Sequence, residues 1–238
     1  MIGGMLVLYG PGRNEVVGRG AAAPSTSTVL TRRLLSAGAL AGPVYLVVGL
    51  AQALTRPGFD ITRHDLSLLS NGDLGWIQVT NFIVSGVLVI AGALGVRRAL
   101  RAGRAGTWGP LLVGVYGLGL IGAGFFVADP VAGFPPGTPV DTPTFSWHGL
   151  LHFASGGIGF LGLIAATLVC ARRFAALGQR RWAAYSVMTG LLFLLGFVGI
   201  ASGSGNSWTV LGFWIAVVLA WAWLTALTTR LKSALPER

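Results

Sequence analysis

The sequence predicts an all-α polytopic membrane protein, a bundle of six transmembrane helices, from three observations. Hydrophobic residues make up 53% of the 238 residues and charged residues only 10%, whereas a soluble domain carries about 25% charged residues. Six apolar runs follow one another, each long enough to cross a hydrocarbon core of about 30 Å as a helix. The runs lack the period-two alternation of strands, so we do not expect a β-barrel.

The chain divides into three parts. Residues 1–33 mix small and polar residues with four arginines, and we expect a mostly disordered cytoplasmic arm without the features of a signal peptide. Residues 34–229 form the transmembrane domain, and residues 230–238 a basic cytoplasmic tail. The predicted spans are 34–54, 76–96, 108–128, 148–171, 182–200 and 208–229.

The basic residues predict the orientation of the spans. All except Arg56 and Arg63 lie in the arm, in two short loops at 97–104 and 172–181, or in the tail. The positive-inside rule keeps these segments in the cytoplasm, so both termini are inside and most acidic residues outside. The net charge of +10 therefore reflects topology, and we predict a multi-pass protein of the cytoplasmic (cell) membrane, with the lipid bilayer and no nucleic acid as partner.

Small residues and tryptophans support a helical bundle. Trp begins or directly precedes five of the spans, as interfacial anchors do. Gly38 and Gly42 form a G-x-x-x-G pattern in the first span, which favours close helix packing in lipid. The single cysteine, Cys170, lies in an apolar run and is expected to be a small buried side chain.

Polar residues inside spans are costly and mark candidate sites. In the fourth span His148, His152 and Ser155 share one helical face, because they are four and seven residues apart. A second stripe of polar residues follows the same rule in the second span and consists of Gln78, Asn81 and Ser85.

Further polar residues are expected at the same depth. Gln52 lies near the outer end of the first span, Asp129 ends the third, and Ser67 belongs to the outer loop between the first two spans. Prolines at 130, 135, 136 and 139 predict a stiff second outer loop that covers this region as a lid or as a plain cap. We predict an outward-facing pocket between spans one to four.

Three hypotheses explain these polar residues. In the first, His148 and His152 bind a metal ion such as zinc together with a carboxylate such as Asp129 or Asp65, and His64 is a candidate further ligand. However, the glutamate of the H-E-x-x-H motif is missing between the two histidines. In the second, they form an acid/base or polar pocket for a lipid or another small hydrophobic ligand. In the third, they are an interhelical hydrogen-bond network, and His64 is a solvated loop residue.

Several motifs resemble a known family. They are the run from His64 to Leu68, the run from Gly75 to Phe82, Asp129-Pro130 with the proline-rich segment 134–139, and the run from His148 to His152. Together they resemble the prokaryotic six-helix membrane family catalogued as domain of unknown function 998, over nearly the whole chain after the arm. The resemblance implies six spans in the cytoplasmic membrane and supplies no activity; its characteristic positions match Ser67, Asn81, Asp129, Pro130 and His152. The Ser, Asp and His residues of the polar cluster are also similar in type to those of the active site in the membrane hydrolases related to alkaline ceramidases.

The predicted function is the binding, or also the processing, of a lipid or other hydrophobic small molecule in an outward-facing pocket of His and Asp. Asp129, His148 and His152 are the candidate catalytic or metal-binding residues, and zinc is the candidate cofactor. Candidate ligand-binding residues are Gln52, Ser67, Gln78, Asn81, Ser85 and Ser155. Two alternatives stay open, which are a non-catalytic transporter-like or structural membrane component and a metal-dependent membrane hydrolase.

Overall fold

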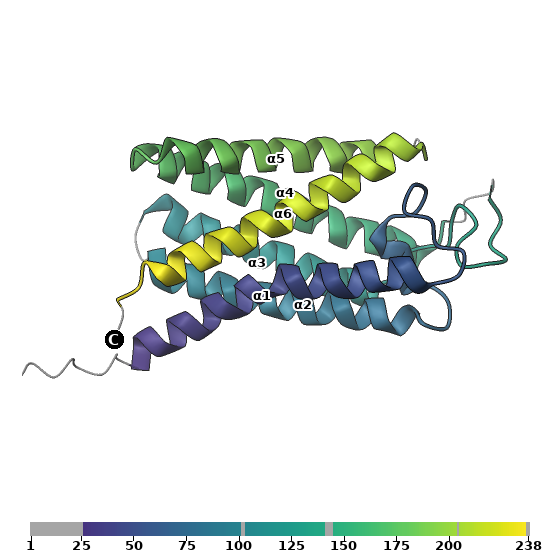
Figure 1. Cartoon of the computed structure of the whole chain (residues 1–238), viewed down its shortest axis with the longest axis horizontal. Helices are drawn as coiled ribbons and strands as arrows, with labels where there is room; N and C mark the ends of the chain where they lie inside the picture. Colours follow the sequence, from purple (N-terminus) through teal and green to yellow (C-terminus); the bar gives the residue numbers. More distant parts are fainter. Residues whose placement is uncertain (1–25, 101–102, 141–144, 204, 237–238) are drawn as a thin grey trace, which may run out of the picture.

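The structure, a computed structural model, describes residues 26–100, 103–140, 145–203 and 205–236. These residues form six long α-helices and a short 3-10 helix (Figure 1). All six α-helices are long and apolar enough to cross a membrane, so the predicted six-helix membrane bundle is confirmed. The helices are α1 (Thr26–Thr55), η1 (Leu66–Ser70), α2 (Gly75–Leu100), α3 (Arg104–Phe125), α4 (Trp147–Ala176), α5 (Arg180–Ala201) and α6 (Ser207–Ser233).

The ends of the helices differ from the predicted spans. Helix α1 begins at Thr26, inside the segment predicted to be a disordered arm, and α6 continues to Ser233, inside the predicted tail. Helix α3 ends earlier than expected, at Phe125. An apolar run measures only the hydrocarbon core, whereas a helix continues into the headgroup region as long as its backbone can hydrogen-bond. The expectation for residues 1–25 lies outside the described residues.

The helices form a closed ring in which each helix packs against its neighbours in sequence and α6 packs against α1. Helix α6 also contacts α2 across the ring. In Figure 1, α6 runs diagonally between α5 and α1, and α1 changes direction about midway, where Pro43 lies. A proline inside a helix removes one backbone hydrogen bond and favours such a bend.

Glycines bring the backbones of neighbouring helices together. A Cβ atom on Gly38 of α1 would lie 2.8 Å from the Cα atom of Gly92 in α2, and a Cβ atom on Gly42 would lie 3.2 Å from the Cβ atom of Trp221 in α6. A Cβ atom on Gly38 would also lie 2.9 Å from the Cγ2 atom of Thr228 in α6, so Gly38 packs against both α2 and α6, and Gly42 packs against α6. The free thiol of Cys170 is buried.

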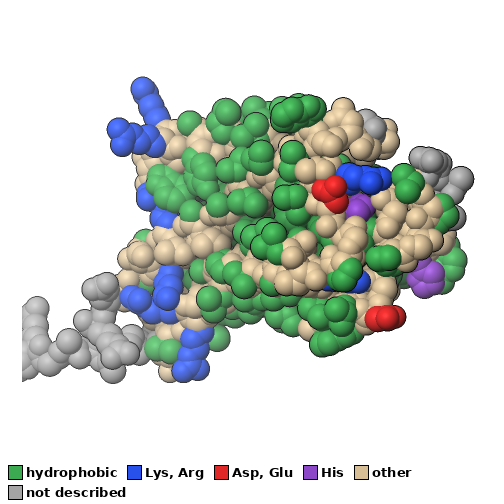
Figure 2. All heavy atoms as spheres, turned by 45° about the vertical axis from the view of Figure 1, so that its right-hand side comes forward, with side chains coloured by type: hydrophobic (Ala, Val, Ile, Leu, Met, Phe, Trp, Pro, Cys, Tyr) green, Lys and Arg blue, Asp and Glu red, His purple; other side chains and the backbone are tan. Residues whose placement is uncertain are grey.

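The bundle has two chemically different ends. One end, here called the loop end, carries the segments 56–74, 126–140 and 145–146 and the described residues of the turn between α5 and α6. The other, the arginine end, carries both described termini, the α2–α3 connection and the α4–α5 turn (Figure 1). Most Lys and Arg side chains visible in Figure 2 gather at the arginine end, and the Asp and His side chains at the loop end.

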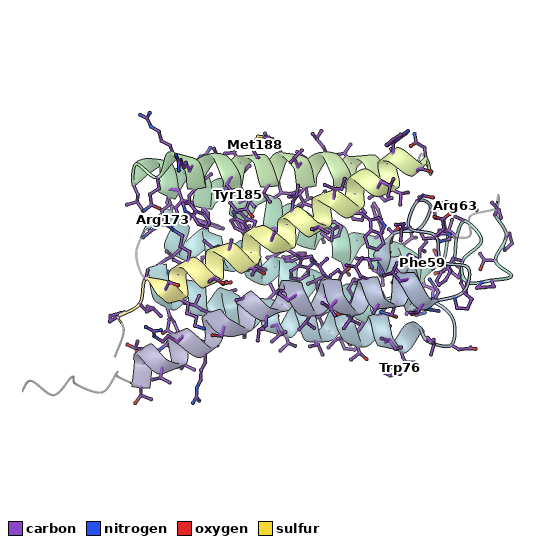
Figure 3. The ribbon with its side chains drawn as sticks, in the orientation of Figure 1. Phe59, Arg63, Trp76, Arg173, Tyr185 and Met188 are labelled. Carbon is purple, nitrogen blue, oxygen red and sulfur yellow. The ribbon has the colours of Figure 1, made fainter. Side chains whose placement is uncertain are left out.

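The surface between these ends is apolar. Helix α5 is the least buried of the six, and in Figure 3 its Met188 points away from the bundle, whereas Tyr185 points inward. Trp76 also points outward at the start of α2 (Figure 3). A surface of this kind is expected to face lipid rather than water.

Candidate functional site

A cavity of about 500 Å³ opens near the loop end of the ring. All six α-helices, η1 and the segment that follows α3 contribute to its lining. The sequence analysis predicted a pocket lined by spans one to four only. This prediction was incomplete, because α5 and α6 form one side of the cavity. A volume of this size is typical of sites that bind small organic molecules.

Two acidic side chains line the cavity, and each is positioned by a helix end. Asp65 is the N-cap of η1, and its Oδ1 atom accepts hydrogen bonds from the backbone N–H (2.8 Å) and the hydroxyl of Ser67. Ser67 also lines the cavity, as predicted for a ligand-binding residue. From the sequence, Asp65 was considered as a carboxylate ligand of a metal and as a cap of a short helix in the outer loop, and the structure confirms the cap.

Asp129 is held at the start of α4. Its carboxylate accepts the backbone N–H of Ser146 at 2.9 Å and the Ser146 hydroxyl at 2.5 Å, while Ser146 caps α4 by accepting the N–H of Gly149. A negative charge is favoured at this position, because the N-terminus of a helix carries partial positive charge. The carboxylate lies directly over Gly149, where a Cβ atom would come 2.0 Å from Oδ2.

His152 lines the same cavity one turn further along α4. Its Nδ1 atom lies 3.0 Å from the carbonyl oxygen of Ala123 and 2.7 Å from that of Phe126, at the C-terminal end of α3. Both partners can only accept, so Nδ1 carries the proton. The Nε2 atom of the neutral ring is then an acceptor, and it has no hydrogen-bond partner among the described residues.

The wall of the cavity on the side of α4, α5 and α6 is aromatic. The Phe160 ring lies at the centre of this wall, with ring centroids 5.3 Å from Phe197 and 5.8 Å from Phe213. Two tyrosines line the cavity deeper in the bundle: Tyr116, with its centroid 5.3 Å from that of Trp221, and Tyr45, at 5.0 Å from Trp221. The site is therefore a largely apolar chamber with its polar groups near the loop end.

The exposed part of the cavity lining lies on the side of α4 and α5. The lining residues with large exposed side chains are Phe145, Leu150 and Phe153, before and along α4, and the exposed Ala201 lies at the end of α5. Lining residues from α1, α2 and α3 are buried. These exposed lining residues are apolar.

A structured cap covers the bundle at the loop end. At its centre is Phe134, which is fully buried and packs edge-on against Phe59 with ring centroids 5.2 Å apart. The guanidinium of Arg56 lies over the Phe134 ring and donates to the carbonyl oxygens of Leu69 and Asn71. Partial burial lowers the pKa of Arg56, and the nearby Asp73 opposes this shift.

His64 belongs to this cap and is neither solvated nor a metal ligand, contrary to both expectations. It is 2% exposed. Its Nδ1 atom accepts the backbone N–H of Asp60 at 2.9 Å, so Nε2 carries the proton and donates to the carbonyl of Ala132 at 3.0 Å. The indole of Trp214 in turn donates to the His64 carbonyl at 3.0 Å, which fastens the cap to α6.

Four residues predicted to bind a ligand are instead buried between α1 and α2. Gln52 donates to Gln78 at 2.9 Å, Asn81 donates to Gln78 and to the Tyr45 carbonyl, and Ser85 donates to Asn81. None of the four lines the cavity. The network leaves the Oε1 atom of Gln52 and the Nε2 atom of Gln78 buried without a partner among the described residues.

The remaining predicted residues do not assemble a metal site. His148 is exposed and stacks on Trp147 with ring centroids 3.5 Å apart, and Ser155 packs against Gly122 of α3. Asp129 and His152 share the cavity but form no ion pair with each other. Among the described residues no group of three His, Cys, Asp or Glu side chains could hold a metal ion.

The aromatic residues of α4 to α6 were missed because a phenylalanine that lines a cavity has the same sequence signal as one that faces lipid. One sequence signal could have indicated a shared wall, which is the helical spacing of the phenylalanines. Phe153 and Phe160 in α4 are seven residues apart, and Phe193 and Phe197 in α5 are four apart, so each pair lies on one face of its helix.

These features define an integral membrane protein in which six spanning helices enclose a cavity beneath a loop cap. Residues 39–230 match the family described as Protein of unknown function (DUF998), and the chain belongs to this family. The predicted resemblance is thereby confirmed. Neither the curated proteins nor the solved structures contain a match to the chain.

Proposed function

We propose that the cavity binds a lipid or another hydrophobic small molecule that reaches it from the bilayer. The observation that carries the proposal is a chamber of about 500 Å³ whose wall is mainly Phe and aliphatic side chains and whose lining includes the exposed apolar side chains of Leu150 and Phe153 in α4. Burial of apolar surface stabilises a bound ligand by roughly 25 cal/mol per Å² before the costs of association.

The lining also favours one kind of polar group on the ligand. Asp65, Asp129 and His152 line the cavity, and no Lys or Arg among the described residues does. An anionic headgroup would be repelled by the two carboxylates, whereas a hydroxyl, amide or ammonium group can donate to them or to the free Nε2 atom of His152. The ligand we propose is therefore an amphiphile with a neutral or cationic polar group.

We propose binding rather than turnover as the function. The Ser67 hydroxyl donates to Asp65, and Asp129 accepts from Ser146, so these groups stabilise helix ends. A metal-dependent hydrolase is not part of the proposal, because His148 is exposed and does not line the cavity that Asp129 and His152 share. The proposed location is the cytoplasmic membrane with the loop end outside, which is supported by the arginines of the other end.

The substitution Gly156→Leu tests the proposal. A Cβ atom on Gly156 of α4, which lines the cavity, meets no atom within 4 Å, so the Leu side chain of Gly156→Leu can fill the chamber without a clash. Gly212→Leu in α6 is the matched control, because Gly212 is equally free of contacts, is exposed and lies outside the lining.

The measurement is mass spectrometry of the hydrophobic molecules that co-purify with each protein. We expect one species in near-stoichiometric amount with the unmodified chain and with Gly212→Leu, and several-fold less with Gly156→Leu. Equal amounts in all three would mean that the lipid only surrounds the bundle. The alternative of a structural membrane component would then be preferred.

A further inference from the structure

A second hollow lies at the arginine end, between the start of α3 and the last turns of α4, on the opposite end of the bundle from the cavity. Its volume is about 390 Å³. It is lined by three arginines and three less polar residues, which are Arg104, Arg172, Arg173, Ala105, Trp108 and Val169.

Among the described residues, no acidic side chain lines this hollow. The acidic side chains that the structure describes, Asp60, Asp65, Asp73 and Asp129, belong to the segments 56–74 and 126–140 at the loop end. Figure 2 shows this separation along the molecule. The side chains of Arg104 and Arg172 are exposed and available to an external anion.

The backbone adds to the attraction for an anion. Helix α3 begins at Arg104, and its N-cap is Gly103, which offers no side-chain acceptor to the first N–H groups. The N-terminus of a helix attracts negative charge, and guanidinium groups bind phosphate oxygens through two parallel N–H donors. A phosphate group matches this combination.

The apolar part of the hollow indicates where the phosphate comes from. Trp108 is 52% exposed beside the arginines, and the exposed Leu111 in α3 and Leu168 in α4 continue the apolar surface toward the middle of the bundle. An indole at the membrane interface contacts glycerol and the upper part of an acyl chain. A soluble anion would make no use of these contacts.

We propose that this hollow binds the headgroup of an anionic glycerophospholipid, with the phosphate on Arg104 and Arg172 and an acyl chain along Trp108. Basic hollows between helices at the cytoplasmic surface are suited to such lipids, and each basic residue near an anionic headgroup strengthens binding about fivefold. The site is independent of the ligand proposed for the cavity.

The test is native mass spectrometry of the full chain in detergent, titrated with phosphatidylglycerol or with phosphatidylcholine of the same acyl chains. We expect the unmodified chain to prefer phosphatidylglycerol. Arg104→Gln and Arg172→Gln should each weaken its binding about fivefold and leave the binding of phosphatidylcholine unchanged. Arg181→Gln, an exposed arginine at the same end outside the hollow, should bind as the unmodified chain does.

Three results would overturn the proposal. Equal affinity of the unmodified chain for the two lipids would remove the headgroup preference. An equal loss with Arg181→Gln would show diffuse surface charge instead of a site. Binding of inorganic phosphate that depends on Arg104 and Arg172, without a preference for phosphatidylglycerol, would assign the hollow to a soluble anion.

Discussion

Two histidines at the loop end illustrate how the partners of a side chain decide its role. His64 accepts at Nδ1 and donates at Nε2, so both ring nitrogens are used within the cap. His152 donates at Nδ1 to the end of α3 and keeps Nε2 toward the cavity. Neither tautomer can be predicted from the sequence, because it depends on backbone carbonyls that are distant along the chain.

We predict that His64→Ala destabilises the protein by about 2–4 kcal/mol, because it leaves a hole in the cap and two backbone groups without a partner. Arg63→Ala is the control, since Arg63 is exposed at the same loop (Figure 3) and should cost less than about 0.5 kcal/mol. The measurement is the thermal unfolding temperature in detergent. Equal shifts for the two variants would contradict the structural role of His64.

A double-mutant cycle tests the position of Asp129 over Gly149. Gly149→Ala should destabilise by about 1–3 kcal/mol, because the new methyl group would occupy the place of the Asp129 carboxylate. Asp129→Ala should cost about 1–2 kcal/mol through the loss of the bonds to Ser146.

The double variant should be less destabilised than the sum of the two, by at least about 0.5 kcal/mol, because the clash is absent once Asp129 is removed. Unfolding measurements on the three variants give this coupling energy. Strict additivity would show that the carboxylate lies elsewhere.

At the scale of the helices, apolar runs predicted the number and order of the spans but not their ends. A 30-residue helix such as α1 is about 45 Å long and reaches through the headgroup layer, and its polar first turn carries no apolar signal. Glycine content predicted close packing. Which helix each glycine meets was not predictable, because Gly38 contacts both α2 and α6, whereas Gly42, one turn later, contacts α6.

The substitution Gly92→Leu should separate α1 from α2. A Cβ atom there would lie 2.6 Å from the Cα atom of Gly38, and a backbone cannot move aside as a side chain can. We expect a loss of about 3 kcal/mol or more, at the upper end of the range for overpacking. Gly114→Leu in α3, where a Cβ atom meets nothing within 4 Å, should change the unfolding temperature little. Similar losses in both would argue against the α1–α2 contact.

At the scale of the whole molecule, the sequence predicted that polar residues gather toward one end of the bundle. It did not predict which of them line the cavity and which form a buried network between helices. The stripe of Gln78, Asn81 and Ser85 faces α1 and is closed off from the cavity, whereas Asp129, His152 and Ser67 reach it. His152 belongs to a stripe in α4 with the same helical spacing as the stripe in α2, so spacing alone does not distinguish the two. Only the order of helices around the ring separates a buried network from the lining of a cavity.

The orientation in the membrane can be tested with introduced cysteines, because the native Cys170 is buried and should not react. We predict that Ser202→Cys, in the turn between α5 and α6, is labelled by a membrane-impermeant maleimide added to intact cells. Arg181→Cys, at the other end of α5, should be labelled only after the cells are opened. The reverse pattern would invert the topology.

The most direct test of the account is an experimental structure of the protein in lipid, with the cavity examined for a bound molecule. We predict elongated density in the cavity, along the wall formed by Phe160, Phe197 and Phe213, with its polar end beside Asp129 and His152. A cavity that is filled by side chains, or that contains only water, would contradict the proposed binding of a hydrophobic molecule.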